Sequence, residues 1–355
     1  MTEKVSAPRA AVPAQALPAP GRIYLFDNLK AVLIFLVLLG HLIEPRLGGL
    51  RTYAYTLIYS FHMPLFVLCS GCFARFEPRR LLTKILYPYA VFQTIYWFFL
   101  QRPEGISLSF FTPYWILWYL LSLFFWTLVL PFAEGGGRRR RRGILVLAFG
   151  AGILAGVDGS AGYLLSLSRT IAFFPFFWLG HCLRQSPLWT AAADPGKARG
   201  RERSWLWPAR LLFAALALGG ALWLYKNQYR INPTWLHCSF GYGVLEYKPL
   251  YRVLHYGMAL VFAGAALAWT PRKRLWFTYL GERSLQVYLL HGFLVKLAVK
   301  YDLYQYVGSH LLAWCIVTAA ALSLILAALP ISRLAGPFMA WPFHAGQKEK
   351  KNVEQ

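Results

Sequence analysis

Apolar segments of membrane length recur along almost the whole chain, and they constrain its fold more than any other feature. Hydrophobic residues make up 57% of the sequence and charged residues only 14%, against roughly a quarter charged in ordinary soluble domains. A helix that spans a bilayer needs about 20 apolar residues and satisfies its own backbone groups. We therefore predict an all-α fold, a polytopic integral membrane helix bundle of about ten transmembrane helices, at residues 29–45, 56–74, 84–101, 113–132, 143–158, 167–183, 208–225, 252–270, 276–297 and 309–331.

The two ends of the chain differ from this apolar body. Residues 1–21 are rich in Ala and Pro and lack the apolar core of a signal peptide, so we expect a disordered cytoplasmic arm. We predict one transmembrane domain over residues 22–335 and a cytoplasmic tail over residues 336–355. Cys69 and Cys72 are close in sequence, but no second Cys or His pair lies at ligand spacing, so we expect buried thiols and no metal site.

The net charge of +23 follows the predicted topology. With the N-terminus in the cytoplasm, 27 of the 37 Lys and Arg residues fall on the cytoplasmic side of the ten predicted spans. This positive-inside bias predicts a multi-pass protein of the cell membrane with both termini in the cytoplasm. The arginine run 138–142 then lies near anionic membrane lipids, and we expect no nucleic-acid partner. The sequence does not fix an oligomeric state.

His41 lies in the first apolar segment, where a titratable side chain is costly. In FDNLKAVLIFLVLLGHLIE, Lys30 and His41 bracket ten residues that are almost all apolar. Such groups usually mark a substrate path, a proton relay or a catalytic site, although a hydrogen-bonded core histidine is the alternative. At about 1.5 Å per residue, His41 is expected about 16 Å beyond Lys30, near the bilayer midplane. Glu44 shares its helix face, and it either orients the imidazole or faces outer water before Pro45.

Several blocks of the sequence, in order, resemble one known family. The first block is followed by YSFHMPLFVLCSGCFARF, RRLLTKILYPY, PYWILWYLLSLFFW, SRTIAFFPFFWLG and LGERSLQVYLLHGFLV. Together they resemble the acyltransferase-three family of membrane-bound acyltransferases, particularly its sugar O-acetylase branch, over residues 22–331. The resemblance implies transfer of an acetyl or other short acyl group from acyl-CoA, most simply acetyl-CoA, to a hydroxyl of a sugar, a glycan or a lipid-linked glycan precursor.

His41 has the chemistry that this reaction needs. Acyl transfer from a thioester to a hydroxyl requires a base for the hydroxyl proton, and imidazole titrates near neutrality. We predict that His41 is the general base and that Glu44 is its orienting partner. No metal is implied.

A cationic loop is the predicted docking site for coenzyme A. The donor carries a pyrophosphate and a ribose phosphate, and the planar guanidinium group binds phosphate oxygens in pairs. We assign the phosphates to the basic residues at the predicted cytoplasmic ends of the first three spans, which are Lys30, Arg75, Arg79, Arg80 and Lys84. The alternative is that the loop is only another positive-inside anchor.

Four further residues are predicted to bind the acceptor, each with a structural alternative. His62 precedes Pro64, which is expected to kink or open the second span, and His62 either contacts the acceptor or bonds a neighbouring helix. His291 either binds acceptor, assists a proton path, or joins helices as a polar contact. Arg169 binds an acceptor oxygen, a lipid phosphate or an oxyanion, or extends to outer headgroups. Trp115, with its neighbours Trp118 and Tyr119, lines an acyl or sugar pocket or belongs to the membrane aromatic belt.

Four other histidines, His181, His237, His255 and His344, carry no comparable argument, because they lie at helix ends or in loops. Asp27 and Asn28 are expected to start the first helix. A rival function is a transporter or flippase for a lipid-linked or acylated sugar, with His41 and His291 in a proton relay. Its signature is repeat symmetry around broken helices, and we find no internal repeat of that kind.

Overall fold

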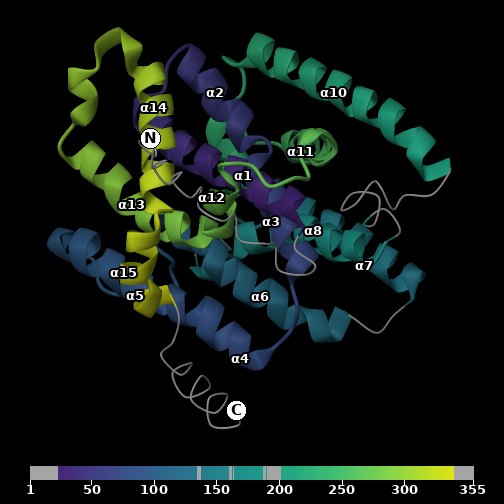
Figure 1. The fold of residues 1–355 in the computed structure, drawn as a ribbon, viewed down its shortest axis with the longest axis horizontal. Coiled ribbons are helices and arrows are strands. Elements are labelled where there is room, and N and C mark those ends of the chain that lie inside the picture. The colour runs from purple at the N-terminus through teal and green to yellow at the C-terminus, as the bar shows by residue number, and fades with distance from the viewer. Residues whose placement is uncertain are drawn as a thin grey trace, which may run out of the picture.

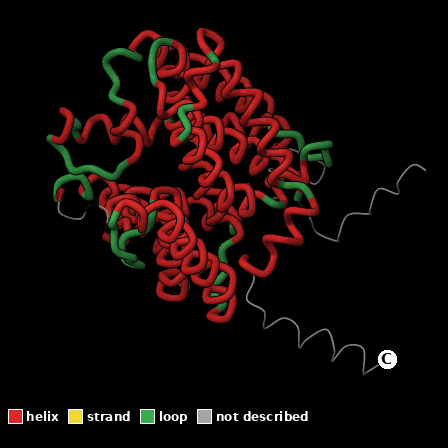
Figure 2. Tube along the Cα trace, turned by 90° about the vertical axis from the view of Figure 1, so that its left-hand side faces the viewer, coloured by secondary structure: helices red, strands yellow, loops and turns green. Residues whose placement is uncertain are grey.

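The structure is a computed structural model that describes residues 23–133, 137–159, 162, 164–186, 189 and 201–339, without the side chains of residues 201–206. Over these residues the chain is helix and connecting loop, with no strand (Figure 2). The all-α fold is confirmed. The predicted arm, residues 1–21, and residues 340–355 of the predicted tail lie outside the described residues.

Most helices follow one another through short connections. In chain order they are α1 (Tyr24–Ile43), α2 (Leu50–Tyr59), α3 (His62–Phe73), α4 (Pro78–Leu81), α5 (Tyr87–Tyr96), α6 (Trp118–Ala133), α7 (Arg138–Leu154), α8 (Leu167–Arg184), α10 (Arg201–Asn227), α11 (Pro249–Trp269), α12 (Thr278–Glu282), α13 (Ser284–Lys300), α14 (Leu311–Leu326) and α15 (Leu329–Met339). Two short 3-10 turns also matter for the site, η5 (Trp115–Leu117) and η9 (Pro233–His237).

Six helical stretches of the described residues are long and apolar enough to cross a membrane. They are Tyr24–Arg46, Leu50–Phe73, Trp115–Ala133, Trp207–Asn227, Pro249–Trp269 and Gly308–Leu326, and each falls on a predicted span. The other four predicted spans are not among them. Residues 167–183 form one continuous helix, α8, and the remaining three are shorter or interrupted helices. Residues 84–101, for example, consist of α5 between π-helical turns at Leu82–Leu86 and Trp97–Gln101. A membrane protein is therefore indicated, and the count of ten spans stays a prediction.

Pro64 interrupts the second predicted span, as expected. α2 ends at Tyr59 and α3 begins at His62, so the helical ladder is broken between them. A proline nitrogen carries no hydrogen, so Pro64 cannot donate to the carbonyl of Ser60, four residues earlier. The break lets side chains from both halves, Tyr59 and His62, line one cavity.

α1 lies in the interior of the bundle, where it contacts α2, α3, α12, α13 and α14 (Figure 1). Near its start, the Asn28 side chain donates to the Pro271 carbonyl at 2.8 Å and accepts from the Thr278 hydroxyl at 2.6 Å. The helix begins at Tyr24, so Asp27 and Asn28 do not start it as predicted. Asn28 instead bonds α1 to the segment that leads into α12.

α3 and α8 cross at backbone contact through two glycines. A Cβ added to Gly71 would overlap the Phe177 carbonyl, and one added to Gly180 would overlap the Leu68 carbonyl. Small residues allow membrane helices to approach this closely. The crossing therefore fixes the relative positions of two helices that carry cavity-lining side chains.

Replacing Gly180 with alanine is expected to destabilise the protein by about 1–3 kcal/mol, because α3 and α8 must separate to admit the methyl group. Thermal unfolding of the detergent-solubilised protein measures the change. Gly219→Ala on α10 is the matched control, since a Cβ there meets nothing within 4 Å. Equal unfolding midpoints for the two variants would contradict the close crossing.

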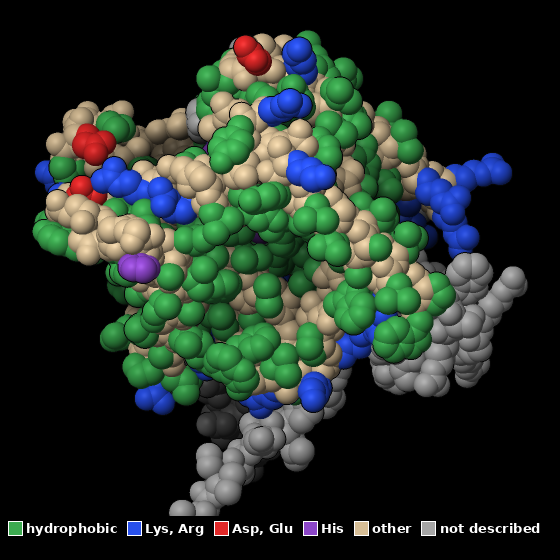
Figure 3. All heavy atoms as spheres, turned by 90° about the horizontal axis from the view of Figure 1, so that it is seen from above, with side chains coloured by type: hydrophobic (Ala, Val, Ile, Leu, Met, Phe, Trp, Pro, Cys, Tyr) green, Lys and Arg blue, Asp and Glu red, His purple; other side chains and the backbone are tan. Residues whose placement is uncertain are grey.

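α10 lies at one edge of the molecule, and α13 and α14 lie at the opposite edge (Figure 1). Only 6% of the membrane-length window of α10, within Trp207–Asn227, is buried by the rest of the protein. Its large exposed side chains include Trp207, Leu211, Leu218 and Trp223. Figure 3 shows a face on which hydrophobic side chains cover the middle and most Lys and Arg side chains lie toward the margins. This is the distribution expected of a protein whose apolar girdle contacts lipid.

Candidate functional site

His41 and Glu44 form a hydrogen-bonded pair at the end of α1. The helix ends at Ile43, and Glu44 opens a 3-10 turn with Pro45. His41 Nδ1 lies 3.0 Å from Glu44 Oε2. When Nδ1–H donates to the carboxylate, Nε2 is the ring atom that accepts a proton. This is the geometry that an orienting role for Glu44 requires.

His41 lies near the C-terminal end of α1 and not near its middle. The helix begins at Tyr24, six residues before Lys30, and His41 belongs to its last turn. Lys30 lies more than one turn inside the helix, so it does not mark the start of α1. The depth of His41 in the bilayer stays a prediction.

Aromatic rings enclose the His41 imidazole. The centroid of the Trp115 ring lies 4.4 Å from that of His41, and the His291 ring stacks on His41 at 5.5 Å. The Tyr59 hydroxyl lies 3.2 Å from His41 Nδ1. Trp115 has a φ of 31°, which is strained for a bulky residue, and the Lys296 ammonium lies 4.5 Å from the Trp115 ring centroid. These contacts fix the orientation of the imidazole.

A cavity of about 190 Å³ opens beside this pair, and we call it the His41 cavity. Three of the predicted acceptor-binding residues, His62, Arg169 and Trp115, line it together with His41 and Glu44. His62 is buried, and its Nδ1–H donates to the Ile58 carbonyl at 2.8 Å. The guanidinium carbon of Arg169 lies 5.3 Å from the Trp118 ring centroid. Arg169 therefore faces this cavity rather than lipid headgroups alone.

His291 is placed behind His41 and does not line the cavity. It is fully buried, and its Nδ1–H donates to the Val287 carbonyl at 3.1 Å. The ring reaches the site through neighbouring rings, because it stacks on His41 and its centroid lies 6.5 Å from that of Trp115. Acceptor binding by His291 stays a prediction.

A second cavity of about 350 Å³ brings together four of the five predicted phosphate-binding residues. This basic cavity is lined by Lys30, Arg75, Arg80 and Lys84. Arg79 is exposed and is not part of its wall. Lys30 also pairs with Asp27 at 2.9 Å. The rest of the wall is mainly apolar and aromatic, with side chains that include Phe66, Tyr119 and Leu120.

The two cavities follow one another along α1. Lys30 lines the basic cavity, and Val37 and His41 line the other. His41 lies eleven positions after Lys30 in the same helix, a length of about 16 Å. The basic cavity and the imidazole thus lie along the same helix.

Three residues near the site are given no role by the sequence prediction, namely Tyr55, Tyr59 and His237. The Tyr55 hydroxyl lies 2.8 Å from His237 Nε2, and the Tyr55 ring stacks on Tyr59 at 4.0 Å. Because Tyr59 contacts His41, these side chains continue the polar cluster away from the imidazole. His237 was given no role because it lies in a loop, and 182 sequence positions separate it from Tyr55. Of these three residues, only Tyr59 carries a sequence signal, because it lies three positions before His62, a predicted site residue.

The His237 environment makes stability depend on pH. Burial, followed by the charge of Arg169, lowers the pKa of His237 to about 4 from an ordinary value of 6.5. Between these two pH values the unfolded chain binds one proton more than the folded protein, so the free energy of unfolding falls as pH falls from 6.5 to 4. Above pH 6.5 the effect is absent.

Thermal unfolding at a series of pH values measures this loss. His237→Gln is expected to lose less stability on acidification than the wild type, because no proton is taken up at this position. His310→Gln, at an exposed histidine, serves as the control and keeps the wild-type slope. An unchanged slope in His237→Gln would show that His237 does not carry the effect.

Comparison with known proteins gives one match. A family model described as an acyltransferase domain matches residues 23–333. Neither a curated protein nor a solved structure matches the chain significantly. Within the described residues, no group of three or more His, Cys, Asp or Glu side chains is arranged to hold a metal ion.

Proposed function

Since the chain belongs to the acyltransferase-three family, we propose that this membrane acyltransferase moves an acetyl group from acetyl-CoA to a hydroxyl of a sugar, a glycan or a lipid-linked glycan precursor. The observation that carries the proposal is the pair of cavities along α1. One has a basic wall suited to an anionic donor, and the other holds the His41–Glu44 pair.

Coenzyme A is assigned to the basic cavity. Lys30, Arg75, Arg80 and Lys84 supply cations for its phosphates, and the apolar walls behind them accommodate the pantetheine arm. The arm extends along α1 and carries the thioester toward His41. Arg79 has no direct contact in this assignment, because it lies outside the cavity wall.

His41 acts as the general base. Its Nε2 takes the proton of the acceptor hydroxyl while the oxygen attacks the thioester carbonyl, and Glu44 accepts the hydrogen bond from Nδ1–H. Collapse of the tetrahedral intermediate breaks the carbon–sulfur bond, and the thiolate of coenzyme A receives the proton from His41. Arg169 and the Tyr59 hydroxyl lie in the same cavity and are the assigned partners of the developing oxyanion.

The acceptor is assigned to the His41 cavity. Trp115 and Trp118 present aromatic surfaces suited to a sugar ring, and His62 and Arg169 add polar contacts. His291 contributes indirectly, through its stacking on His41. In the proposed topology ten spans cross the cell membrane, both termini are cytoplasmic, and the basic cavity opens to the cytoplasm, where acyl-CoA is available.

The decisive experiment is release of free coenzyme A by the detergent-purified protein, given acetyl-CoA and a panel of glycan acceptors. Acceptor-dependent release in detergent supports a transferase, because transport needs two compartments. No release with any acceptor, together with no detectable binding of acetyl-CoA, would contradict the proposal and favour a transporter of a lipid-linked or acylated sugar.

A further inference from the structure

Tyr288 of α13 stands between the two cavities. Among the described residues it is the one that lines both the basic cavity and the His41 cavity. On the side of the basic cavity its ring packs edge-to-face against Tyr119, with centroids 5.6 Å apart. On the other side its ring lies 6.1 Å from that of His291, the residue that stacks on His41.

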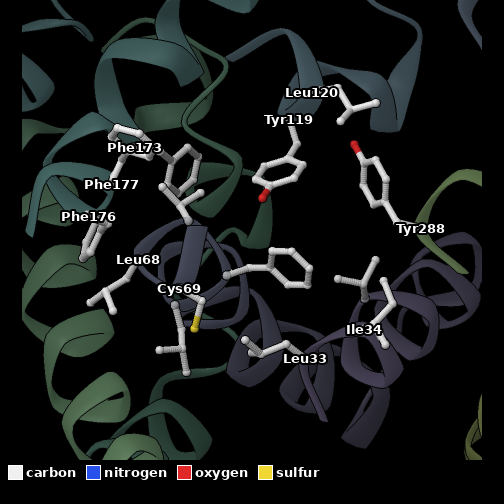
Figure 4. Close-up of a cluster of buried hydrophobic side chains, with 14 of the residues drawn as sticks. Leu33, Ile34, Leu68, Cys69, Tyr119, Leu120, Phe173, Phe176, Phe177 and Tyr288 are labelled. Atoms are coloured by element: carbon white, nitrogen blue, oxygen red, sulfur yellow. The ribbon is translucent and has the colours of Figure 1, made fainter. Parts of the chain in front are cut away.

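The Tyr288 ring is held in this position by its surroundings. Only 6% of the residue is exposed, and its hydroxyl donates to the Ile116 carbonyl. Figure 4 shows Tyr119 and Tyr288 near one another, with Leu33 and Ile34 of α1 below them in the view. The Tyr288 ring thus forms a partition between the two cavities, and the hydrogen bond of its hydroxyl to Ile116 is the polar anchor that holds the ring in place.

The anchor also connects Tyr288 to the catalytic imidazole. Ile116 follows Trp115, whose strained backbone holds its ring 4.4 Å from His41. A movement of Tyr288 into the basic cavity or away from it breaks the bond to η5, the turn that carries Trp115. A bulky group that displaces Tyr288 therefore also disturbs the packing of His41.

We propose that Tyr288 is a specificity-determining residue that restricts the transferred acyl group to short chains. The inference rests on the proposed function, in which the thioester passes from the basic cavity to His41. An acetyl group passes the ring with the hydroxyl still bonded to Ile116. Each added methylene must displace the ring from its place between Tyr119 and His291, at the expense of the hydroxyl anchor and of the packing around His41.

The test compares acetyl-, propionyl-, butyryl- and hexanoyl-CoA as donors for the wild type, Tyr288→Leu and Tyr288→Phe. The ratio of kcat/KM for butyryl-CoA to that for acetyl-CoA is expected to rise about tenfold or more in Tyr288→Leu, because the partition is shortened. Tyr288→Phe keeps the ring but loses the anchor, so a smaller rise is expected. Tyr256 supplies the matched control, as a buried tyrosine that donates to the Ala172 carbonyl and lines neither cavity.

The possible results distinguish a failure of the role of Tyr288 from a failure of the proposed function. An unchanged donor ratio in both Tyr288 variants, with wild-type turnover of acetyl-CoA, would overturn the role of Tyr288 and leave the proposed function standing. An equal rise in Tyr256→Leu would also overturn it, because general loosening would then explain the result. Absence of turnover in the wild type with all four donors would overturn both. If Tyr288→Leu does not fold, the ratio in Tyr288→Phe decides.

Discussion

Replacing His41 with alanine is expected to lower kcat for acyl transfer about 100- to 10,000-fold, the usual contribution of a positioned general base. The imidazole is the proton acceptor nearest the acceptor hydroxyl in the proposed arrangement, and Glu44 cannot replace it from 3.0 Å behind Nδ1. Free coenzyme A, measured with the best acceptor of the panel, gives kcat. Binding of acetyl-CoA, measured by calorimetry, should be retained because Lys30 and the basic loop are unchanged.

Two further variants make the His41 result specific. Glu44→Gln keeps the size of the side chain but loses the carboxylate that holds Nδ1–H, so an intermediate loss of kcat is expected. His310→Ala removes an exposed histidine outside both cavities and should leave turnover unchanged. Normal transfer by His41→Ala would remove His41 from the chemistry altogether.

The double variant Arg75→Ala/Arg80→Ala is expected to raise the KM for acetyl-CoA roughly 10- to 100-fold with little change in kcat. Each guanidinium supplies a charge-assisted bond to phosphate that is made equally before and during the reaction. Because both residues are exposed, added salt should raise the KM of the wild type for acetyl-CoA. The ratio of the variant KM to the wild-type KM should therefore become smaller at high salt.

Arg79→Ala is the matched comparison, because Arg79 and Arg80 are neighbours in α4 and only Arg80 lines the cavity. Its KM should stay within about twofold of the wild type, as expected for a surface charge that makes no direct contact. If Arg79→Ala and Arg80→Ala raise KM equally, the loop acts through its total charge, and the assignment of individual contacts is wrong.

The catalytic role of His41 stays a prediction. The sequence alone singles it out as a candidate, because burial of a titratable group in an apolar helix has few explanations. It also predicted the break at Pro64, since a missing N–H acts locally on one helical turn. The basic loop was predicted as a whole, but not the difference between Arg79 and Arg80. That difference depends on how the one-turn helix α4 is oriented relative to the other helices, and no local sequence pattern determines this orientation.

Contacts between distant parts of the chain were beyond sequence reasoning. His237 reaches Tyr55 across 182 positions, and a histidine in a loop carries no sign of such a partner. The same holds for Tyr288, which had no predicted role and lines both cavities only because α13 packs beside α1. The start of α1 at Tyr24, six residues before Lys30, is likewise not marked by a local capping residue in the sequence.

The nearly bare surface of α10 has a consequence for handling the protein. With 6% of its window covered by the rest of the chain, this helix depends for most of its lateral contacts on whatever apolar solvent surrounds it. Thorough delipidation exchanges acyl chains for detergent along almost its whole length, while α1 and α3, enclosed by their neighbours, see little change. Retained or added lipid should therefore protect α10 first, and proteolysis or hydrogen exchange should detect its loosening before the helices around His41 respond.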